Sequence, residues 1–225
     1  MIRAVVFDFD GVIANSEPLH FRAYRAVLAG KGIDLTEASY YSRYLGFDDV
    51  GAFGAVAADA GVPLDDGEIG ELVAAKAITL EALERETSVL FSGAREAITA
   101  MAAHWPIAIA SGALKQEIRR VLERERLQTY FPIIVAAGDT PLSKPDPAPY
   151  ALAVEQLART VPGLRPSECV AIEDSLWGLQ SARGAGLRTV AITHTYPADA
   201  LRDAADIVVE RMTQFTPELV RRIEA

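Results

Sequence analysis

The amino-acid sequence predicts an α/β protein with a Rossmann-like, mostly parallel sheet, helices on both faces of the sheet, and an inserted α-helical domain. Six short β-type runs occur along the 225 residues, and helical stretches lie between most of them. Strands that alternate with helices in this way are typical of a parallel sheet covered on both sides. Between the first and second runs lie roughly 70 residues of helical pattern, far more than one crossover connection requires. That excess predicts a separate domain inserted after the first strand.

The β-type runs and the helices between them define the predicted core. The first four runs are almost continuously apolar, as expected of strands that are covered on both faces. In chain order the runs are Arg3–Phe7, Ile107–Ala110, Ile133–Ala137, Cys169–Ile172, Thr189–Ile192 and Asp206–Val209. The helices predicted between them are Ala94–His104, Leu114–Leu127, Pro147–Ala158 and Ser175–Ala185.

The inserted segment is predicted to form helices separated by residues that end helices. Glycine and proline occur at the expected breaks. The helices are predicted at Leu19–Ala29, Glu37–Leu45, Val50–Ala60 and Gly67–Glu86. We therefore expect a Rossmann-like core of residues 1–14 and 86–225 and a small helical domain of residues 15–85.

The composition is that of a globular, acidic protein. Acidic residues outnumber basic ones by 31 to 22, and the formal net charge is −9. A field of that sign repels nucleic acid and anionic membranes, so we expect neither as a partner. The one cysteine, Cys169, excludes an intrachain disulfide and suits a reducing cytosol. No signal-peptide pattern or membrane-length apolar run is visible, so we expect a cytoplasmic protein; the oligomeric state is unknown.

The strongest chemical signal is the segment Asp8-Phe9-Asp10-Gly11-Val12, which follows the first predicted strand. Ligands of open parallel sheets bind beyond the carboxyl ends of the strands, so acids at this point lie where chemistry is expected. Successive residues of an extended chain point in opposite directions, so Asp8 and Asp10 could face the same side. Gly11 permits a tight turn. By itself the segment is also compatible with a surface turn.

Three further polar segments follow other predicted strands. Ser111-Gly112 follows the second strand and opens a helix, so its hydroxyl and backbone amides could form an anion site. Lys144 lies in the segment after the third strand, and Glu173-Asp174 follow the fourth strand and open another helix. Each alone is compatible with an ordinary surface or capping role. Together they predict carboxylates, a cation and an anion-binding helix start at one edge of one sheet.

This set of motifs resembles the haloacid dehalogenase superfamily over essentially the whole chain. The four family motifs occur in order as Asp8-Phe9-Asp10-Gly11, Ser111, Lys144 and Glu173-Asp174. The helical insertion is similar to the α-helical cap of the subgroup that contains beta-phosphoglucomutases and phosphoglycolate phosphatases. The resemblance therefore implies a phosphatase with a Rossmann-like core and a cap domain at residues 15–85.

The resemblance also implies roles for the two aspartates after the first strand. Asp8 would attack phosphorus and form an aspartyl-phosphate that water then hydrolyses. Asp10 would protonate the leaving oxygen and later deprotonate the water. Because a halide leaving group needs no proton, the presence of Asp10 argues against dehalogenation.

The remaining motif residues would bind the metal and the phosphate. The resemblance implies Mg²⁺, held by the Asp8 carboxylate and the Asp10 backbone carbonyl, with Asp174 and Glu173 as further oxygen ligands. Lys144 would neutralise Asp8 and the transferring group, and Ser111 would bind a phosphate oxygen, with Gly112 beside it. The expected substrate is a small phosphorylated metabolite, with a sugar phosphate preferred and phosphoglycolate a weaker candidate.

Residues of the helical domain are expected to distinguish a phosphatase from a mutase. Ser16 and His20 follow the first motif as in beta-phosphoglucomutase, and Ser16, His20, Arg43 and Gly46 are candidate substrate-binding residues. A mutase must hold a second phosphate, yet Leu45 and Asp49 stand where the resemblance expects basic residues. Each lost charged contact weakens such a site by about a few kcal/mol. We therefore favour a phosphatase, with a mutase as the alternative and a catalytically silent sugar-phosphate-binding protein as the alternative of another class.

Overall fold

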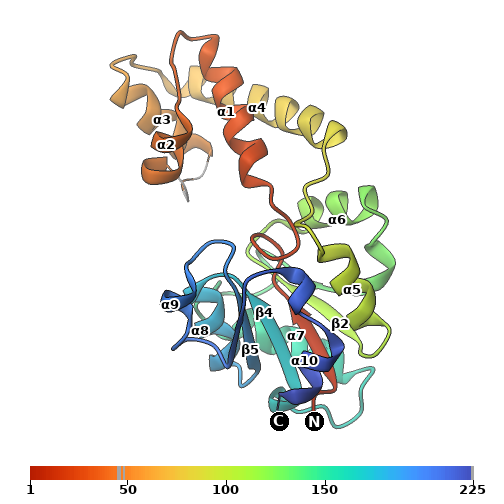
Figure 1. Cartoon of the computed structure of the whole chain (residues 1–225). Helices are drawn as coiled ribbons and strands as arrows, with labels where there is room; N and C mark the ends of the chain where they lie inside the picture. The colour runs from red at the N-terminus through yellow and green to blue at the C-terminus, as the bar shows by residue number, and fades with distance from the viewer. Residues whose placement is uncertain (45–46, 48, 224–225) are drawn as a thin grey trace. The chain divides into compact units, whose positions relative to one another are not determined.

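The computed structural model describes residues 1–44, 47 and 49–223. Contacts between Cα atoms divide the chain into two compact units, Met1–Asn15 with Leu90–Ala225 and Ser16–Val89 (Figure 1). Hydrophobic residues form separate clusters within the two units. We call the first the core unit and the second the helical unit.

The core unit contains one six-stranded sheet in which every neighbouring pair of strands is parallel. The strand order is β3-β2-β1-β4-β5-β6, so the first strand of the chain lies at the centre of the sheet. In chain order the strands are β1 (Ala4–Phe7), β2 (Ile107–Ala110), β3 (Ile133–Val135), β4 (Cys169–Glu173), β5 (Arg188–Ile192) and β6 (Ile207–Val209). The predicted α/β class is confirmed, and the strands lie within two residues of their predicted bounds.

Helices cover both faces of this sheet because successive strand residues point to opposite sides. Ala4 and Val6 of β1 face a cluster that includes Tyr150 and Leu157 of α7. Phe7 packs edge-on against the rings of Phe131 and Phe215, with centroid distances of 5.8 Å and 5.7 Å. The helices of this unit are α5 (Ala94–Ala102), α6 (Lys115–Arg124), α7 (Ala148–Ala158), α8 (Leu176–Gly184), α9 (Ala198–Leu201) and α10 (Pro217–Arg222), with short 3₁₀ turns at Gln128–Tyr130, Pro166–Glu168 and Met212–Gln214.

Strand β3 differs from the prediction that apolar runs are covered on both faces. It lies at the edge of the sheet, and among the described strands only β2 pairs with it. Ile133 and Ile134 are half-buried, and Val135 alone of its three residues is buried. An apolar run reports burial in general, so it does not distinguish an edge strand from a central one.

The described residues of the helical unit form α1 (Glu17–Ala29), α2 (Glu37–Ser39), a π-helical turn at Tyr40–Tyr44, α3 (Asp49–Asp59) and α4 (Asp66–Glu86). Helices α1 and α4 pack against each other, and Phe21, Leu28 and Phe53 contribute to the hydrophobic cluster. Helix α4 begins with a capping box, in which the Asp65 side chain accepts from the Glu68 N–H and the Glu68 side chain accepts from the Asp65 N–H. This pairing satisfies donors that the first turn of a helix leaves free.

In the described part of the chain, no helix combines the length and the apolar character that crossing a bilayer requires.

Candidate active site

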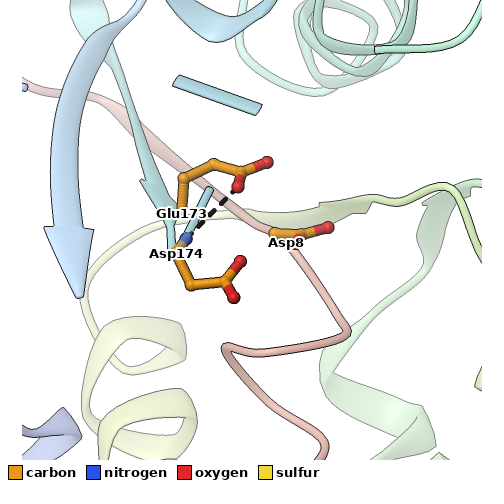
Figure 2. A group of neighbouring side chains, drawn as sticks. All are labelled: Asp8, Glu173 and Asp174. Atoms are coloured by element: carbon orange, nitrogen blue, oxygen red, sulfur yellow. Dashed lines mark hydrogen bonds between the residues drawn. The ribbon is translucent and has the colours of Figure 1, made fainter. Parts of the chain in front are cut away.

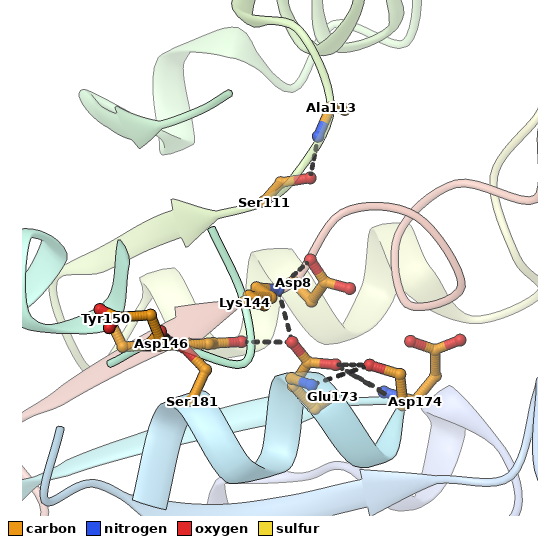
Figure 3. Close-up of polar contacts among 11 residues, drawn as sticks. Asp8, Ser111, Ala113, Lys144, Asp146, Tyr150, Glu173, Asp174 and Ser181 are labelled. Carbon is orange, nitrogen blue, oxygen red and sulfur yellow. Dashed lines mark hydrogen bonds and ion pairs between the residues drawn. The ribbon is translucent and has the colours of Figure 1, made fainter. Parts of the chain in front are cut away.

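Four segments that are far apart in sequence meet at the carboxyl edge of the sheet (Figure 3). Asp8 follows β1 directly, and Ser111 follows β2 directly. Glu173 is the last residue of β4, and Asp174 comes next. Lys144 lies in the connection between β3 and α7. Parallel strands end on the same side of a sheet, so the topology itself brings these side chains to one place.

Three buried carboxylates form the centre of the site (Figure 2). Asp8, Glu173 and Asp174 each offer an oxygen atom, and these atoms all lie within 4.8 Å of one another. Their exposed fractions are 6%, 0% and 5%. The backbone holds Asp8 against the neighbouring strand, because its N–H donates to the Ile172 carbonyl at 3.0 Å.

The ammonium group of Lys144 bridges two of these carboxylates. Its Nζ lies 2.7 Å from Asp8 Oδ1 and 2.5 Å from Glu173 Oε1. Burial by itself would lower the pKa of Lys144, but the charges of Asp8 and Glu173 outweigh that effect and raise it. Lys144 therefore stays protonated, and it is the cation that a buried cluster of acids requires.

Glu173 is held by a second set of contacts that the sequence analysis missed. The Tyr150 hydroxyl donates to Glu173 Oε1 at 2.8 Å, and the Ser175 hydroxyl donates to Oε2 at 3.1 Å. Burial, followed by the charge of Glu173, raises the pKa of Tyr150 well above its usual value, so this phenol remains a donor. A tyrosine on the apolar face of the helix after Lys144 was the available signal, because a buried hydroxyl requires a partner.

Gly178 leaves the space that Glu173 occupies. A Cβ atom at this position would lie 1.9 Å from both Cδ and Oε1 of Glu173. The Gly178 N–H donates to the Ser175 hydroxyl at 3.0 Å, which is the N-cap bond of α8. The first turn of α8 thus packs closely against the Glu173 carboxylate.

Burial disfavours ionisation of Asp8 and Asp174. It raises the pKa of Asp8 well above its usual value, and the charge of Glu173 adds to the rise while Lys144 opposes it. Burial also raises the pKa of Asp174 to about 6, although a hydrogen bond from Thr195 opposes the rise. When ionised, the three carboxylates and Lys144 carry a net charge of −2. Oxygen ligands with this surplus of negative charge fit a divalent metal ion.

The turn after β1 differs from the extended geometry that the sequence suggested. Val12, Ile13 and Ala14 donate their N–H groups to the Phe9 carbonyl, so the chain turns at once. In this turn Asp10 is exposed, whereas Asp8 is buried. Among the described residues, the carboxylate cluster consists of Asp8, Glu173 and Asp174 without the Asp10 side chain.

Ser111 and Gly112 lie in the connection from β2 to α6, ahead of the helix itself. The Ser111 N–H donates to the Val135 carbonyl at 2.9 Å, and the Ser111 hydroxyl accepts from the Ala113 N–H at 3.0 Å. Helix α6 begins at Lys115, so Ser111 does not open it as the sequence analysis expected. The hydroxyl proton of Ser111 is not used in the bond with Ala113.

The predicted substrate-binding residues of the insertion lie in the helical unit. Ser16 precedes α1 and His20 lies within it. Arg43 lies in the π-helical turn, where its guanidinium is 2.5 Å from Asp59 Oδ2. Gly46, and also Leu45, on which the mutase comparison partly depends, lie outside the described residues.

The helical unit contains a buried cation that no sequence pattern indicated. Lys76 is 3% exposed, and its Nζ lies 2.6 Å from Asp49 Oδ1 and 3.0 Å from His20 Nδ1. The Tyr24 hydroxyl donates to the same Asp49 oxygen at 2.6 Å. Burial opposes ionisation of Asp49, but the hydrogen bonds from Lys76 and Tyr24 hold its pKa below the usual value. Asp49 therefore neutralises Lys76.

Comparisons with known proteins show which family the chain resembles. The family model of haloacid dehalogenase-like hydrolases matches residues 2–186. Hexitol phosphatase B of Escherichia coli is 30% identical over 219 residues, which are 96% of this chain and 95% of that protein. A phosphorylated carbohydrates phosphatase of Thermotoga maritima is 31% identical over 196 residues, with 84% of each chain covered.

Two further comparisons concern a longer protein and a solved structure. The chain is 30% identical, over 92% of its length, to the chloroplastic protein SUPPRESSOR OF QUENCHING 1 of Arabidopsis thaliana, but it spans only 19% of that protein. A solved structure of a Thermotoga maritima protein, provisionally assigned as a beta-phosphoglucomutase, superposes with a TM-score of 0.84 at 26% identity. The superposition covers 99% of this chain and 100% of the other. With its family match and these relatives, the chain belongs to the haloacid dehalogenase-like hydrolase family and is an enzyme of that family.

Proposed function

We propose that this enzyme is a Mg²⁺-dependent phosphomonoester hydrolase that acts on a small phosphorylated metabolite, most favourably a sugar phosphate, through an aspartyl-phosphate on Asp8. The observation that carries the proposal is the pairing of a buried Asp8 carboxylate with Lys144 at 2.7 Å, beside two further buried acids. An ordinary surface turn would not place a carboxylate in such a setting. A nucleophile that must approach an anionic phosphate requires this kind of positive neighbour.

In the proposed reaction an Asp8 carboxylate oxygen attacks phosphorus, and the bond from phosphorus to the ester oxygen breaks. Asp10 gives its proton to the departing oxygen, which leaves as an alcohol. Water then attacks the aspartyl-phosphate and gives one proton to Asp10, so inorganic phosphate is released and both aspartates are restored. Lys144 offsets charge on Asp8 and on the transferring group, and Ser111 donates its hydroxyl proton to a phosphate oxygen.

The acidic cluster fits the metal that this chemistry uses. Asp8, Asp174 and Glu173 would hold Mg²⁺, with the Asp10 backbone carbonyl as a further ligand. When bound, the ion supplies positive charge that allows the carboxylate nucleophile and the phosphate to approach each other. Glu173 already accepts hydrogen bonds from Lys144, Tyr150 and Ser175, so we assign it a more indirect part in metal binding than Asp174.

The proposed substrate class follows from the relatives, whose names describe phosphatases of hexitols and of phosphorylated carbohydrates. We further propose that residues 15–85 act as a cap domain and that Ser16, His20, Arg43 and Gly46 contribute to substrate selection. The free, buried Cys169 suits a reducing compartment, and we place the enzyme in the cytoplasm.

A phosphosugar mutase is the second candidate, because a protein assigned to that activity shares the fold at 26% identity. The charges of the helical unit favour hydrolysis instead. Two cations of the helical unit, Arg43 and Lys76, lie 2.5 Å and 2.6 Å from the carboxylates of Asp59 and Asp49, which already neutralise them. Beta-glucose 1-phosphate, supplied with a bisphosphate activator, separates the activities. Release of inorganic phosphate supports our proposal, and efficient formation of glucose 6-phosphate contradicts it.

Replacement of the nucleophile tests the proposal directly. Asp8→Asn removes the attacking charge, so we expect Mg²⁺-dependent hydrolysis of p-nitrophenyl phosphate to fall by roughly 10³-fold or more. Asp199→Asn is the matched control, because the side chain of Asp199 is 94% exposed, and it should leave the rate unchanged. Full activity of the Asp8→Asn variant would exclude the mechanism. A wild-type protein that binds sugar phosphates but releases no phosphate would instead indicate the silent binding protein.

A further inference from the structure

The loop that follows β5 makes two contacts with the active site, and neither is part of the chemistry described above. This loop comprises residues 193–197, between β5 and α9. His194 and Thr195 are neighbours in it, and each holds a different piece of the carboxyl edge of the sheet. The sequence pattern assigns no role to either residue.

Thr195 holds the carboxylate of Asp174. Its hydroxyl donates a hydrogen bond to Asp174 Oδ2, and the same oxygen lies against Gly11, where an added Cβ atom would come within 1.9 Å of it. Gly11 has a φ of 79°, which glycine adopts readily and other residues do not. The Asp174 carboxylate is therefore held between the Thr195 hydroxyl and the Gly11 backbone, and its freedom to rotate is small.

His194 contacts the backbone of Gly11, the residue against which the Asp174 carboxylate lies. Its Nδ1 lies 2.8 Å from the Gly11 carbonyl, which can only accept, so Nδ1 is the donor. The imidazole also stacks on Phe91, with ring centroids 3.8 Å apart and an interplanar angle of 12°. The Phe91 N–H in turn donates to the Ile13 carbonyl at 3.1 Å. The ring thus joins the turn after β1 to the segment that precedes α5.

The two neighbouring side chains hold two groups that touch each other. Thr195 orients the Asp174 carboxylate, and His194 orients the backbone of the turn that contains Asp10 and Gly11. The proposed metal site takes one ligand from each of these groups. Partners that orient metal ligands in this way commonly change metal affinity by about 10- to 100-fold when they are removed.

We propose that Thr195 and His194 are positioning residues that set the spacing between Asp174 and the turn after β1, and thereby the affinity of the site for a divalent cation. This inference rests on the metal-dependent function proposed above. It concerns binding of the metal rather than the chemical step, so it can be measured without substrate.

The test is a set of binding isotherms on the full-length protein. Mn²⁺ binding is followed by electron paramagnetic resonance and Mg²⁺ binding by calorimetry, in the absence of substrate. Thr195→Val removes the hydroxyl at nearly constant volume, so we expect the dissociation constant to rise about 10- to 100-fold. Thr195→Ser retains the hydroxyl donor, so its dissociation constant should stay within about threefold of the wild-type value. The His194→Phe variant keeps a ring for the stack on Phe91 but loses the donor, and it should weaken binding by about tenfold.

Thr193→Val is the matched control, because it makes the same chemical change two residues earlier in the same loop. Its binding constant should equal that of the wild type. Thr195 is exposed, so its substitution is not expected to unfold the protein, and urea unfolding of each variant checks this. If Thr195→Val proves unstable, the pair Thr195→Ala and Thr195→Ser makes the same comparison.

The outcomes separate this inference from the function on which it depends. Equal affinity of the wild type and Thr195→Val, or equal weakening by Thr195→Val and Thr195→Ser, overturns the inference and leaves the metal-dependent function intact. A wild-type protein that binds neither cation overturns both. Weakening by Thr195→Val with recovery in Thr195→Ser supports the inference, even if the physiological substrate differs from the one proposed.

Discussion

Gly178→Ala should destabilise the core unit although alanine is the better helix former. Gly178 lies in the first turn of α8 (Leu176–Gly184), and a Cβ atom there would meet the Glu173 carboxylate at 1.9–2.1 Å. Such a distance is far below van der Waals contact, so the carboxylate must move. It would then lose its contacts with Lys144 at 2.5 Å and Tyr150 at 2.8 Å.

The size of the effect follows from two opposing contributions. Replacement of glycine by alanine in a helix stabilises by up to about 1 kcal/mol. Disruption of a buried, hydrogen-bonded ion pair costs about 3–5 kcal/mol. We therefore expect the free energy of unfolding of the Gly178→Ala variant to fall by about 2–4 kcal/mol.

Gly184→Ala provides a matched control in the same helix. A Cβ atom at this exposed position would lie 3.4 Å from Pro147, which is an ordinary contact, so this variant should be neutral or slightly stabilised. Urea unfolding in EDTA, followed by tryptophan fluorescence, measures both variants. Both tryptophans, Trp105 and Trp177, lie in the core unit, so the signal reports that unit. Equal stability of the two variants would refute the steric argument.

Two further predictions concern the core unit. Lys144→Met removes the ammonium that bridges two buried carboxylates, so it should lower the free energy of unfolding by about 3–5 kcal/mol. The control Lys115→Met breaks a partly exposed ion pair with Asp139 and should lower it by at most about 1 kcal/mol. Equal losses of the two variants in urea unfolding would contradict this ranking. Burial raises the pKa of the Cys169 thiol to about 12. A disulfide reagent at pH near 8 should therefore label this thiol only after the protein unfolds. Rapid labelling of the folded protein would contradict the prediction.

The sequence predicted the strands and most helices closely because each has a local signature. Buried strands appear as apolar runs, and helices lie between them with recognisable breaks. The segment Glu37–Leu45 was the weakest prediction, since residues up to Tyr44 divide into the short helix α2 and a π-helical turn. Both conformations have similar side-chain periodicity, so the pattern does not distinguish them.

The family and the hydrolase activity were also predicted from the sequence, and the comparisons confirm them. The individual roles of Asp8, Asp10, Ser111 and Lys144 stay predictions, and the substitutions above test the most important of them. Order along the chain was enough to place Asp8 and Glu173 together, because all strands of a parallel sheet end at the same edge, whereas the position of Lys144 also depends on the path of the connection after β3.

Local pattern and parallel topology thus determined the fold class and where the candidate site lies: Asp8 follows the central strand because an apolar run ends there. Tertiary structure alone decided which side chains pair with one another in the folded chain. Tyr150 meets Glu173, and Thr195 meets Asp174, across 23 and 21 residues of sequence. Asp49 neutralises Lys76 across 27 residues. Such contacts depend on how whole elements pack, and no local periodicity records them, so they became visible only in the folded chain.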